Sequence, residues 1–479
     1  MGYKEYQGVL QLKQQKIVSR KPFKSYNRSL KGCINCKRRK IKCDETKEQC
    51  MNCVRRKLDC KWPEPVEKPI KVENDVLETP VEPSAVLESP QQLVRYGSPE
   101  TSLPIQIDSI FLVQFAQRFL PTLAQPHFNH RVPTQSLVHA VSEKSDLVRQ
   151  MSIACGASLV AFDDQAFRPV ARSRYVTALS SFIKAMRNGF LGSEEWLFLA
   201  VQVLQTLSLR DPMAGCNATR CAVHLNAAYE LFISRILRSD ALATSLERVM
   251  IENFLFNYSL TIMFCDHTKI EELIPSPFVL FFDFHTRFLT LCEEDEYPQF
   301  SRLSIIAFQI AAKATWSCRL SLPLLEYEKH LHIELLQLAE TCLFMSETLE
   351  APASVQIFDT LTVTKVVLHT SIILLKKMIE PCIRASVLQP SIDALVRLVK
   401  GSNDYVVIPI WSSFIAASAS TKNEDRQRFI QTLEKLMARS GSHLINRVYN
   451  YLEALWEIYT GDEPFDLLLD TTALSKICD

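Results

Sequence analysis

Apolar residues recur at helical spacing along most of the chain beyond residue 105. One run follows an i, i+3, i+4 pattern and consists of Tyr175, Ala178, Leu179, Phe182, Ile183 and Met186. Side chains with this spacing lie on one face of an α-helix. The pair Asn188-Gly189 follows the run and is typical of a helix end. The pattern therefore predicts an amphipathic helix that ends at this pair.

Two further segments combine a helix start signal with an apolar stripe. Ser193 begins the first segment and Asn423 the second, and two acidic residues follow each of them. A polar cap and acids in the first turn favour a helix N-terminus. The predicted buried stripes are Trp196, Leu199, Ala200, Val203, Leu204 and Leu207 in the first, and Phe429, Ile430, Leu433 and Leu436 in the second. Because alternating strand patterns are scarce, we predict a mostly α fold with one large all-helical domain over residues 105–479.

The composition supports this fold class. Glycine contributes only 11 of 479 residues, against about 7% in an average protein, which argues against barrels, sandwiches and Gly-rich nucleotide-binding loops. The best uncharged run extends from Tyr405 to Thr421 and is shorter than the ~20 apolar residues that a membrane span needs. We expect a buried core helix there, no membrane partner, and no secretory signal in Met1 to Lys16.

The N-terminal part of the chain differs in charge and proline content. Residues 63–104 contain eight of the 23 prolines, which prevents a continuous helix and favours extended chain. Residues 1–62 carry a net charge of +13 and the remainder −12, so the basic segment is expected to meet a polyanion. We predict a flexible basic arm (1–30), a compact module (31–62), a Pro-rich linker (63–104) and the helical domain.

Six cysteines lie within this module, at the spacing C-x2-C-x6-C-x6-C-x2-C-x6-C. They are Cys33, Cys36, Cys43, Cys50, Cys53 and Cys60. A C-x2-C pair lets two thiolates reach one metal ion, and zinc takes four ligands in a tetrahedron. Two tetrahedra offer eight ligand positions, so six thiolates complete both only if two sulfurs are shared. The spacing therefore predicts a cluster of two Zn²⁺ per chain.

Other interpretations of the cysteines fit less well. A disulfide framework needs an oxidising compartment, a redox C-x-x-C needs only one pair, and a single zinc would leave two cysteines without a metal. Nine further cysteines between residues 155 and 478 form no C-x2-C pair. We expect these nine to be small buried hydrophobic residues.

Five of the six residues that follow the second cysteine of the cluster are cationic. They are Lys37, Arg38, Arg39, Lys40 and Lys42. Such a run can be a solvated surface or a nuclear-import signal, but beside a zinc scaffold it favours DNA binding, with most contacts to phosphates and few to bases. RNA is less favoured, since Trp62 is the only aromatic residue nearby for base stacking.

Residues 28–62 resemble the fungal binuclear zinc-cluster DNA-binding domain. The resemblance implies that Cys33 and Cys50 bridge the two ions. One zinc would be held by Cys33, Cys36, Cys43 and Cys50, and the other by Cys33, Cys50, Cys53 and Cys60. It also implies that Lys40, assisted by Arg39, reads a CGG-like triplet while Lys37 and Lys42 contact phosphates. The chain departs from the family pattern at Lys37, where arginine is usual, and at Glu48, where proline is common.

Two stretches of the helical part are similar to the fungal transcription-factor regulatory domain. One is Leu197 to Ile236, especially HLNAAYELFISRI. The other is Ile408 to Leu436, IPIWSSFIAASASTKNEDRQRFIQTLEKL, in which Trp411, Phe414, Ile415 and Arg426 match the family. The resemblance implies a helical domain that regulates activity. The C-terminal DEPFDLLLD resembles activation segments, although a packed amphipathic helix is the favoured interpretation.

We find no catalytic motif in the helical part. His330 and His332 are two residues apart, which places them on different helix faces, and His224 is expected to be a packed helix residue. We therefore predict that the chain is not an enzyme. The expected function is nuclear, zinc-dependent, sequence-specific regulation of RNA polymerase II genes through double-stranded DNA, with coregulators and a homodimer left open. The alternative is a zinc-stabilised protein–protein adaptor.

Overall fold

The computed structural model describes part of the chain, and structural statements below concern that part. The described residues are 33, 36, 46, 49–54, 60–62, 103–119, 145–187, 200–201, 203–207, 222, 224–230, 245–264, 274, 276–278, 292, 297–318, 320, 322–349, 354–402 and 406–458. The chain divides into two compact units, one formed by Gln11–Ser98 and the other by Met1–Leu10 with Pro99–Asp479.

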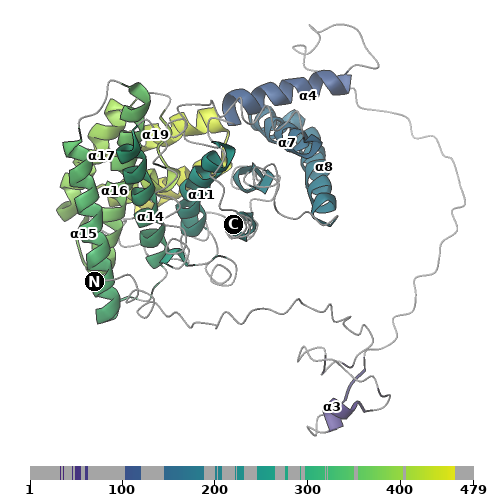
Figure 1. Ribbon diagram of the computed structural model, residues 1–479, viewed down its shortest axis with the longest axis horizontal. Coiled ribbons are helices and arrows are strands. Elements are labelled where there is room, and N and C mark those ends of the chain that lie inside the picture. The colour runs from purple at the N-terminus through teal and green to yellow at the C-terminus, as the bar shows by residue number, and fades with distance from the viewer. Residues whose placement is uncertain are drawn as a thin grey trace, which may run out of the picture. The chain divides into compact units, whose positions relative to one another are not determined.

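All regular elements of the described residues are helices (Figure 1). The smaller unit contains α3 (Met51–Val54). The larger unit contains α4 (Leu103–Gln114), η2 (Phe115–Phe119), α7 (Asp146–Asp163), η3 (Gln165–Phe167), α8 (Arg168–Arg187), α11 (Ser245–Phe264), α14 (Pro298–Ser317), α15 (Glu326–Thr348), α16 (Val355–Ile379), η5 (Ala385–Leu388), α17 (Gln389–Gly401), α18 (Ile410–Ala419), α19 (Asn423–Ser440) and α20 (His443–Ile458). The predicted fold class is confirmed.

Helix α16 is the central element of the larger unit and packs against α14, α15, α17 and α18. Its segment Ile357–Ile379 is, in the described part, the one helix long and apolar enough to cross a membrane by length and composition. In the fold, 83% of its most apolar window is buried inside the protein. Its apolar character is therefore accounted for by its position in the domain core.

The predicted stripe at the second start signal is confirmed in α19. Phe429, Ile430, Leu433 and Leu436 are all buried, as expected for one face of an amphipathic helix that packs against α18 and α20. The helix ends at Gly441, whose φ of 58° lies in the left-handed region that favours glycine. The helix start is also correct within one residue, since Lys422 is the flanking residue and Asn423 the first helical one.

The apolar run before α19 forms the buried helix α18, as predicted. Pro409 directly precedes the helix, where its missing N–H costs no hydrogen bond. Trp411 and Phe414 are each 1% exposed, and Phe414 packs edge-on against Phe264 of α11. This helix thus joins the C-terminal elements to the middle of the chain.

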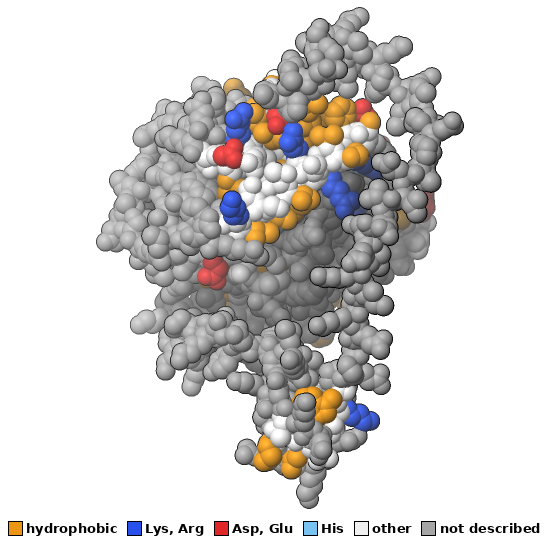
Figure 2. Space-filling view, turned by 90° about the vertical axis from the view of Figure 1, so that its right-hand side faces the viewer, with side chains coloured by type: hydrophobic (Ala, Val, Ile, Leu, Met, Phe, Trp, Pro, Cys, Tyr) orange, Lys and Arg blue, Asp and Glu red, His pale blue; other side chains and the backbone are white. Residues whose placement is uncertain are grey.

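Helices α4, α7 and α8 form a second group of packed helices. Pro104, which the sequence pattern groups with the linker, lies in the first turn of α4, where proline is tolerated. Tyr175 and Ala178 of α8 are buried as predicted, whereas Ile183 is 41% exposed. Figure 2 shows apolar and cationic side chains interspersed on the face that it presents.

The prediction that the nine further cysteines are buried is wrong at one of the five that the structure describes; Cys216, Cys221, Cys265 and Cys478 lie outside the described residues. Cys155, Cys292, Cys318 and Cys342 are buried, but Cys382 is exposed, because it lies in the turn that follows α16. Of the first predicted stripe, Ala200, Val203, Leu204 and Leu207 are buried and helical. Trp196, Leu199, the basic arm, the Pro-rich linker and the C-terminal DEPFDLLLD lie outside the described residues.

Candidate metal centre

The second C-x2-C pair of the cluster is positioned by the start of helix α3. The carbonyl of Cys50 accepts hydrogen bonds from the backbone N–H groups of Cys53 (2.9 Å) and Val54 (3.0 Å). This single turn brings residues three apart onto the same side of the backbone. Cys50 and Cys53 therefore present both sulfurs to one interior, where each is fully buried.

Four cysteine sulfurs meet in this interior. The sulfurs of Cys33, Cys36, Cys50 and Cys53 all lie within 4.8 Å of one another. The Cys33–Cys50 and Cys36–Cys50 sulfur distances are 3.6 Å, and the Cys33–Cys53 distance is 3.8 Å. Sulfurs at the corners of a tetrahedron with Zn–S bonds of ~2.3 Å lie about 3.8 Å apart. The donor set and its dimensions therefore fit zinc.

The thiols in this cluster influence each other's ionisation. Burial raises the pKa of Cys50, and the thiols of Cys53, Cys36 and Cys33 raise it further. Burial also acts to raise the pKa of Cys33, but hydrogen bonds from Cys36 and Cys50 outweigh burial and lower the pKa to about 6. Cys33 thus ionises readily, whereas Cys50 resists ionisation, chiefly because burial disfavours its thiolate. A divalent cation among the sulfurs would favour the thiolate form of both.

The remaining predicted ligands are described to different extents. Cys60 is buried, and its sulfur accepts a hydrogen bond from the backbone N–H of Cys50 at 3.3 Å. Burial and the neighbouring thiols of Cys33 and Cys53 raise the pKa of Cys60, against the hydrogen bond from Cys50. Cys43 lies outside the described residues, as do the predicted DNA-contacting residues Lys37, Arg38, Arg39, Lys40 and Lys42.

Sequence reasoning missed a structural neighbour of the cluster. Trp62 packs against the buried cysteines, whereas from the sequence it was a candidate only for base stacking. Its position two residues after Cys60 could have predicted this packing. A large aromatic ring so close to a zinc ligand is well placed to shield the sulfurs from water.

The residues that resemble the regulatory family form packing contacts in the helical domain. Trp411, Phe414 and Ile415 belong to its core. Arg426 is 9% exposed, donates a hydrogen bond from Nε to the Ser420 carbonyl at 2.8 Å, and lies 5.2 Å from the ring centre of Trp456. This arginine therefore fixes the turn between α18 and α19.

The histidines of the helical domain lie as predicted. His330 is exposed on α15 and contacts Glu334, while His332 is 1% exposed on another face of the same helix. Burial lowers the pKa of His332, and its Nδ1 lies 2.6 Å from the Glu328 carbonyl. His224 is half-buried in a helical segment.

Two family models match the chain. The Fungal Zn(2)-Cys(6) binuclear cluster domain matches residues 31–69, and the Fungal specific transcription factor domain matches residues 110–470, which is most of the chain. No curated protein and no solved structure shows a significant match. The cluster domain binds two zinc ions, which confirms the predicted cofactor. Both families are non-enzymatic regulators, in agreement with the prediction that the chain is not an enzyme.

Proposed function

Because the chain belongs to the fungal specific transcription factor family, we propose that it regulates RNA polymerase II genes by reading CGG-like triplets in the DNA major groove. The two matched domains together make it a DNA-binding transcription regulator. One observation carries the finer proposal. The sulfurs of Cys33, Cys36, Cys50 and Cys53 meet at zinc distances, and the basic run 37–42 directly follows Cys36.

The proposed zinc ligands are the six cysteines, with Cys33 and Cys50 shared. One zinc takes Cys36 and Cys43 in addition to the shared pair, and the other takes Cys53 and Cys60. The three short sulfur–sulfur distances support this assignment, because each of them includes Cys33 or Cys50. A shared sulfur must approach the private ligands of both ions.

The proposed DNA contacts lie on the run that follows Cys36. Lys40, assisted by Arg39, reads the triplet, since lysine and arginine are the side chains that best bind the acceptor atoms of guanine in the major groove. Lys37 and Lys42 contact phosphates, which supply affinity but little sequence information, and Arg38 belongs to the same DNA-binding run. Two zinc ions and six thiolates carry a net charge of −2, and these cations surround that charge with a positive outer surface.

Two lysine variants test this division of roles. Lys40→Ala should cost about 1–3 kcal/mol on the selected duplex and relax discrimination against random duplex. Lys37→Ala should weaken binding to all duplexes alike and reduce the log-salt slope by about 1. Fluorescence anisotropy on specific and random duplexes measures both effects. Equal losses on both duplexes for both variants would remove the base-reading role.

The proposed roles of the four segments of the chain follow from the same interpretation of the sequence. The arm (1–30) adds non-specific attraction to DNA, residues 31–62 recognise the site, the linker (63–104) tethers the module, and residues 105–479 regulate it in the nucleus. Selection of bound duplexes from a random pool reports the sequence read, and the number and spacing of half-sites report whether one chain or a homodimer binds. Coregulators would then be sought with the helical domain.

A protein–protein adaptor is the second candidate function. Met51 and Val54 of α3 are 50% and 45% exposed, so the module has apolar side chains that a protein partner can cover. Salt titration separates the two functions. DNA binding through Z phosphates weakens with a log-salt slope of about −0.9Z, whereas an adaptor has no measurable affinity for duplex DNA at any salt concentration.

A further inference from the structure

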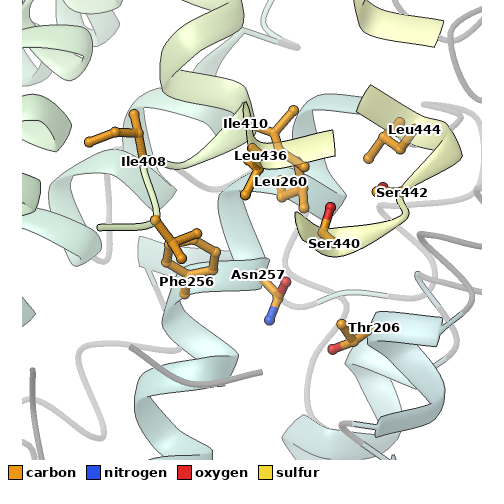
Figure 3. A pocket seen from close by; sticks show the side chains of 11 residues that line it. Thr206, Phe256, Asn257, Leu260, Ile408, Ile410, Leu436, Ser440, Ser442 and Leu444 are labelled. Carbon is orange, nitrogen blue, oxygen red and sulfur yellow. The ribbon is translucent and has the colours of Figure 1, made fainter. Parts of the chain in front are cut away.

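A small cavity lies where helices α11, α19 and α20 meet the segment that joins α17 to α18 (Figure 3). It has a volume of about 40 Å³. Its lining combines two buried serine hydroxyls with a wall of apolar side chains. We propose that this cavity binds a small neutral molecule, in which a hydroxyl or amide group is joined to one or two methyl groups.

Ser440 and Ser442 supply the two hydroxyls. These residues are 3% and 2% exposed, and neither hydroxyl makes a hydrogen bond within the described part of the chain. A buried hydroxyl without a partner is unfavourable, because folding has removed its hydrogen bonds to water. Since both hydroxyls line the cavity, a molecule bound there can restore a hydrogen bond to each of them.

The turn between α19 and α20 holds the two serines in this position. Gly441 lies between them, and its backbone N–H donates a hydrogen bond to the Met437 carbonyl at 2.8 Å. A Cβ atom at Gly441 would lie only 2.9 Å from the side chain of Leu159, so the turn packs closely against α7. Arg118 also donates a hydrogen bond to the Ala438 carbonyl at 3.4 Å. The hydroxyls are therefore preorganised, which lowers the cost of binding a ligand.

Asn257 of α11 adds a hydrogen-bond acceptor to the cavity. Its amide nitrogen donates to the backbone and side-chain oxygens of Asn253, at 2.9 and 2.5 Å, which leaves its own side-chain oxygen for a ligand. In Figure 3 this oxygen lies on the side of Ser440, whereas Phe256 and Ile408 lie to the left of the polar groups. The cavity thus has a polar side and an apolar side, and a molecule with a polar head and a methyl tail matches both.

The volume of the cavity limits the ligand to very few atoms. A water-sized group needs about 10–15 Å³ of such volume, so the cavity has room for about three or four non-hydrogen atoms. Water alone suits the cavity less well, because a buried water forms about three hydrogen bonds and most of the described lining residues are apolar. A ligand with one polar group fills the same volume with fewer hydrogen bonds.

The lining favours a neutral ligand over an ion. Among the described residues, no lysine, arginine, histidine, aspartate or glutamate lines the cavity. An ion without a partner of opposite charge is far more costly to bury than a hydroxyl or an amide. Acetamide and acetate make this distinction testable, because they are nearly equal in shape and differ in charge.

The test uses the full-length zinc-loaded protein without DNA, so its result does not depend on the proposed DNA binding. The probes are 2-propanol and acetamide, which are both of the required size, with acetate as the charged counterpart. Ligands this small reach dissociation constants of about 0.1 mM at best, and ligand-observed NMR titration measures affinities of this order. At least one neutral probe should bind, and acetate should bind at least tenfold more weakly than that probe.

The double variant Ser440→Ala/Ser442→Ala should weaken the binding by about tenfold or more, since it removes two hydrogen-bonding groups from the cavity. The matched control is Ser413→Ala/Ser418→Ala in α18. The hydroxyls of Ser413 and Ser418 are also buried without a hydrogen-bond partner among the described residues, but they do not line the cavity. The control should bind as the wild type does, and far-UV circular dichroism should show wild-type helix content for both double variants.

Three results would overturn the proposal. The first is absence of binding by both neutral probes, which would leave the cavity to ordered water. The second is acetate binding as tightly as the neutral probe, a comparison that needs no variant. The third is equal binding by the wild type and Ser440→Ala/Ser442→Ala, or an equal loss in the control variant.

Discussion

Cys50 combines two tasks at the scale of a single residue. Its sulfur lies 3.6 Å from the sulfurs of both Cys33 and Cys36, and its carbonyl begins the turn of α3. Under the proposed ligand assignment, this sulfur serves both zinc ions, whereas that of Cys53 serves one. The contribution of each cysteine to the module is therefore expected to be unequal.

Replacement of a shared ligand should empty both zinc sites. Cys50→Ala leaves each tetrahedron one ligand short, and metal binding provides the folding free energy of such small modules. We expect fewer than one zinc per chain by elemental analysis of the purified protein, against two for the wild type. The matched control is Cys382→Ala, at an exposed cysteine of the helical domain, which should retain both ions. Retention of two ions by Cys50→Ala would contradict the shared role.

His369 gives the helical domain a sensitivity to acid. Burial lowers its pKa to about 4, and Arg397 and Lys365 act in the same direction. The charged imidazolium is therefore disfavoured in the folded state. Because the folded pKa lies below the unfolded value of about 6.5, this contribution to stability is fully present above pH 6.5 and is lost as the pH falls toward 4.

The expected loss is about 3 kcal/mol in the free energy of unfolding between pH 6.5 and pH 4. Denaturant unfolding, monitored by far-UV circular dichroism at each pH, measures this loss. The unfolding free energy should fall less steeply with decreasing pH in His369→Gln, which cannot bind the proton. His330→Gln serves as the control, because His330 is exposed. An unchanged slope in His369→Gln would mean that other groups cause the acid sensitivity.

At the scale of elements, close approach of helices depends on small residues at particular positions. Gly156 lies in the buried face of α7, and a Cβ atom there would overlap the backbone of Phe111 in α4. The backbones of α4 and α7 therefore come into direct contact at Gly156, where a side chain would keep them apart. This contact joins α4 to the rest of the domain.

Gly156→Ala should destabilise the helical domain by roughly 1–3 kcal/mol, the usual cost of overpacking. Gly401→Ala is the matched control, since nothing lies within 4 Å of a Cβ atom at this last position of α17. In a helix, alanine is favoured over glycine by up to about 1 kcal/mol, so the control should be neutral or slightly stabilising. Thermal unfolding of both variants gives the comparison. Similar melting temperatures for the two would exclude the close approach.

The sequence pattern predicts helices better than it predicts how they meet. The stripe of Phe429, Ile430, Leu433 and Leu436 is a local periodic signal, and burial of one face follows from it directly. The contact of Gly156 with α4 joins residues 45 positions apart, and no local period reveals it.

The metal centre was more accessible to sequence reasoning because its chemistry dictates its spacing. Four thiolates can reach one ion only if short turns bring them together, so the C-x2-C pairs and the count of six predict the cluster without knowledge of the fold. The packing of Trp62 against the cysteines could not be predicted in this way, since a tryptophan is not a ligand and many positions would allow it.

At the scale of the whole molecule, the two units are stabilised by different means. The helical domain has a continuous core of buried side chains, whereas the described core of the smaller unit consists of five cysteines with Trp62 packed against them. Among the described residues, the one group of cysteines that can hold a metal ion lies in the smaller unit. Removal of zinc should therefore act on one unit alone.

Chelation should thus separate DNA binding from helical structure. In reducing buffer with excess chelator, we expect specific duplex binding to be lost, because the thiolates repel one another without their cations. The far-UV signal should stay nearly unchanged, since helices α4 to α20 contain most of the described helical residues. Restored zinc should restore binding, whereas added Mg²⁺ should not, because thiolates favour zinc over magnesium. A chelated protein that still binds its selected duplex would show that the cysteine cluster is not what holds the DNA-reading surface in place.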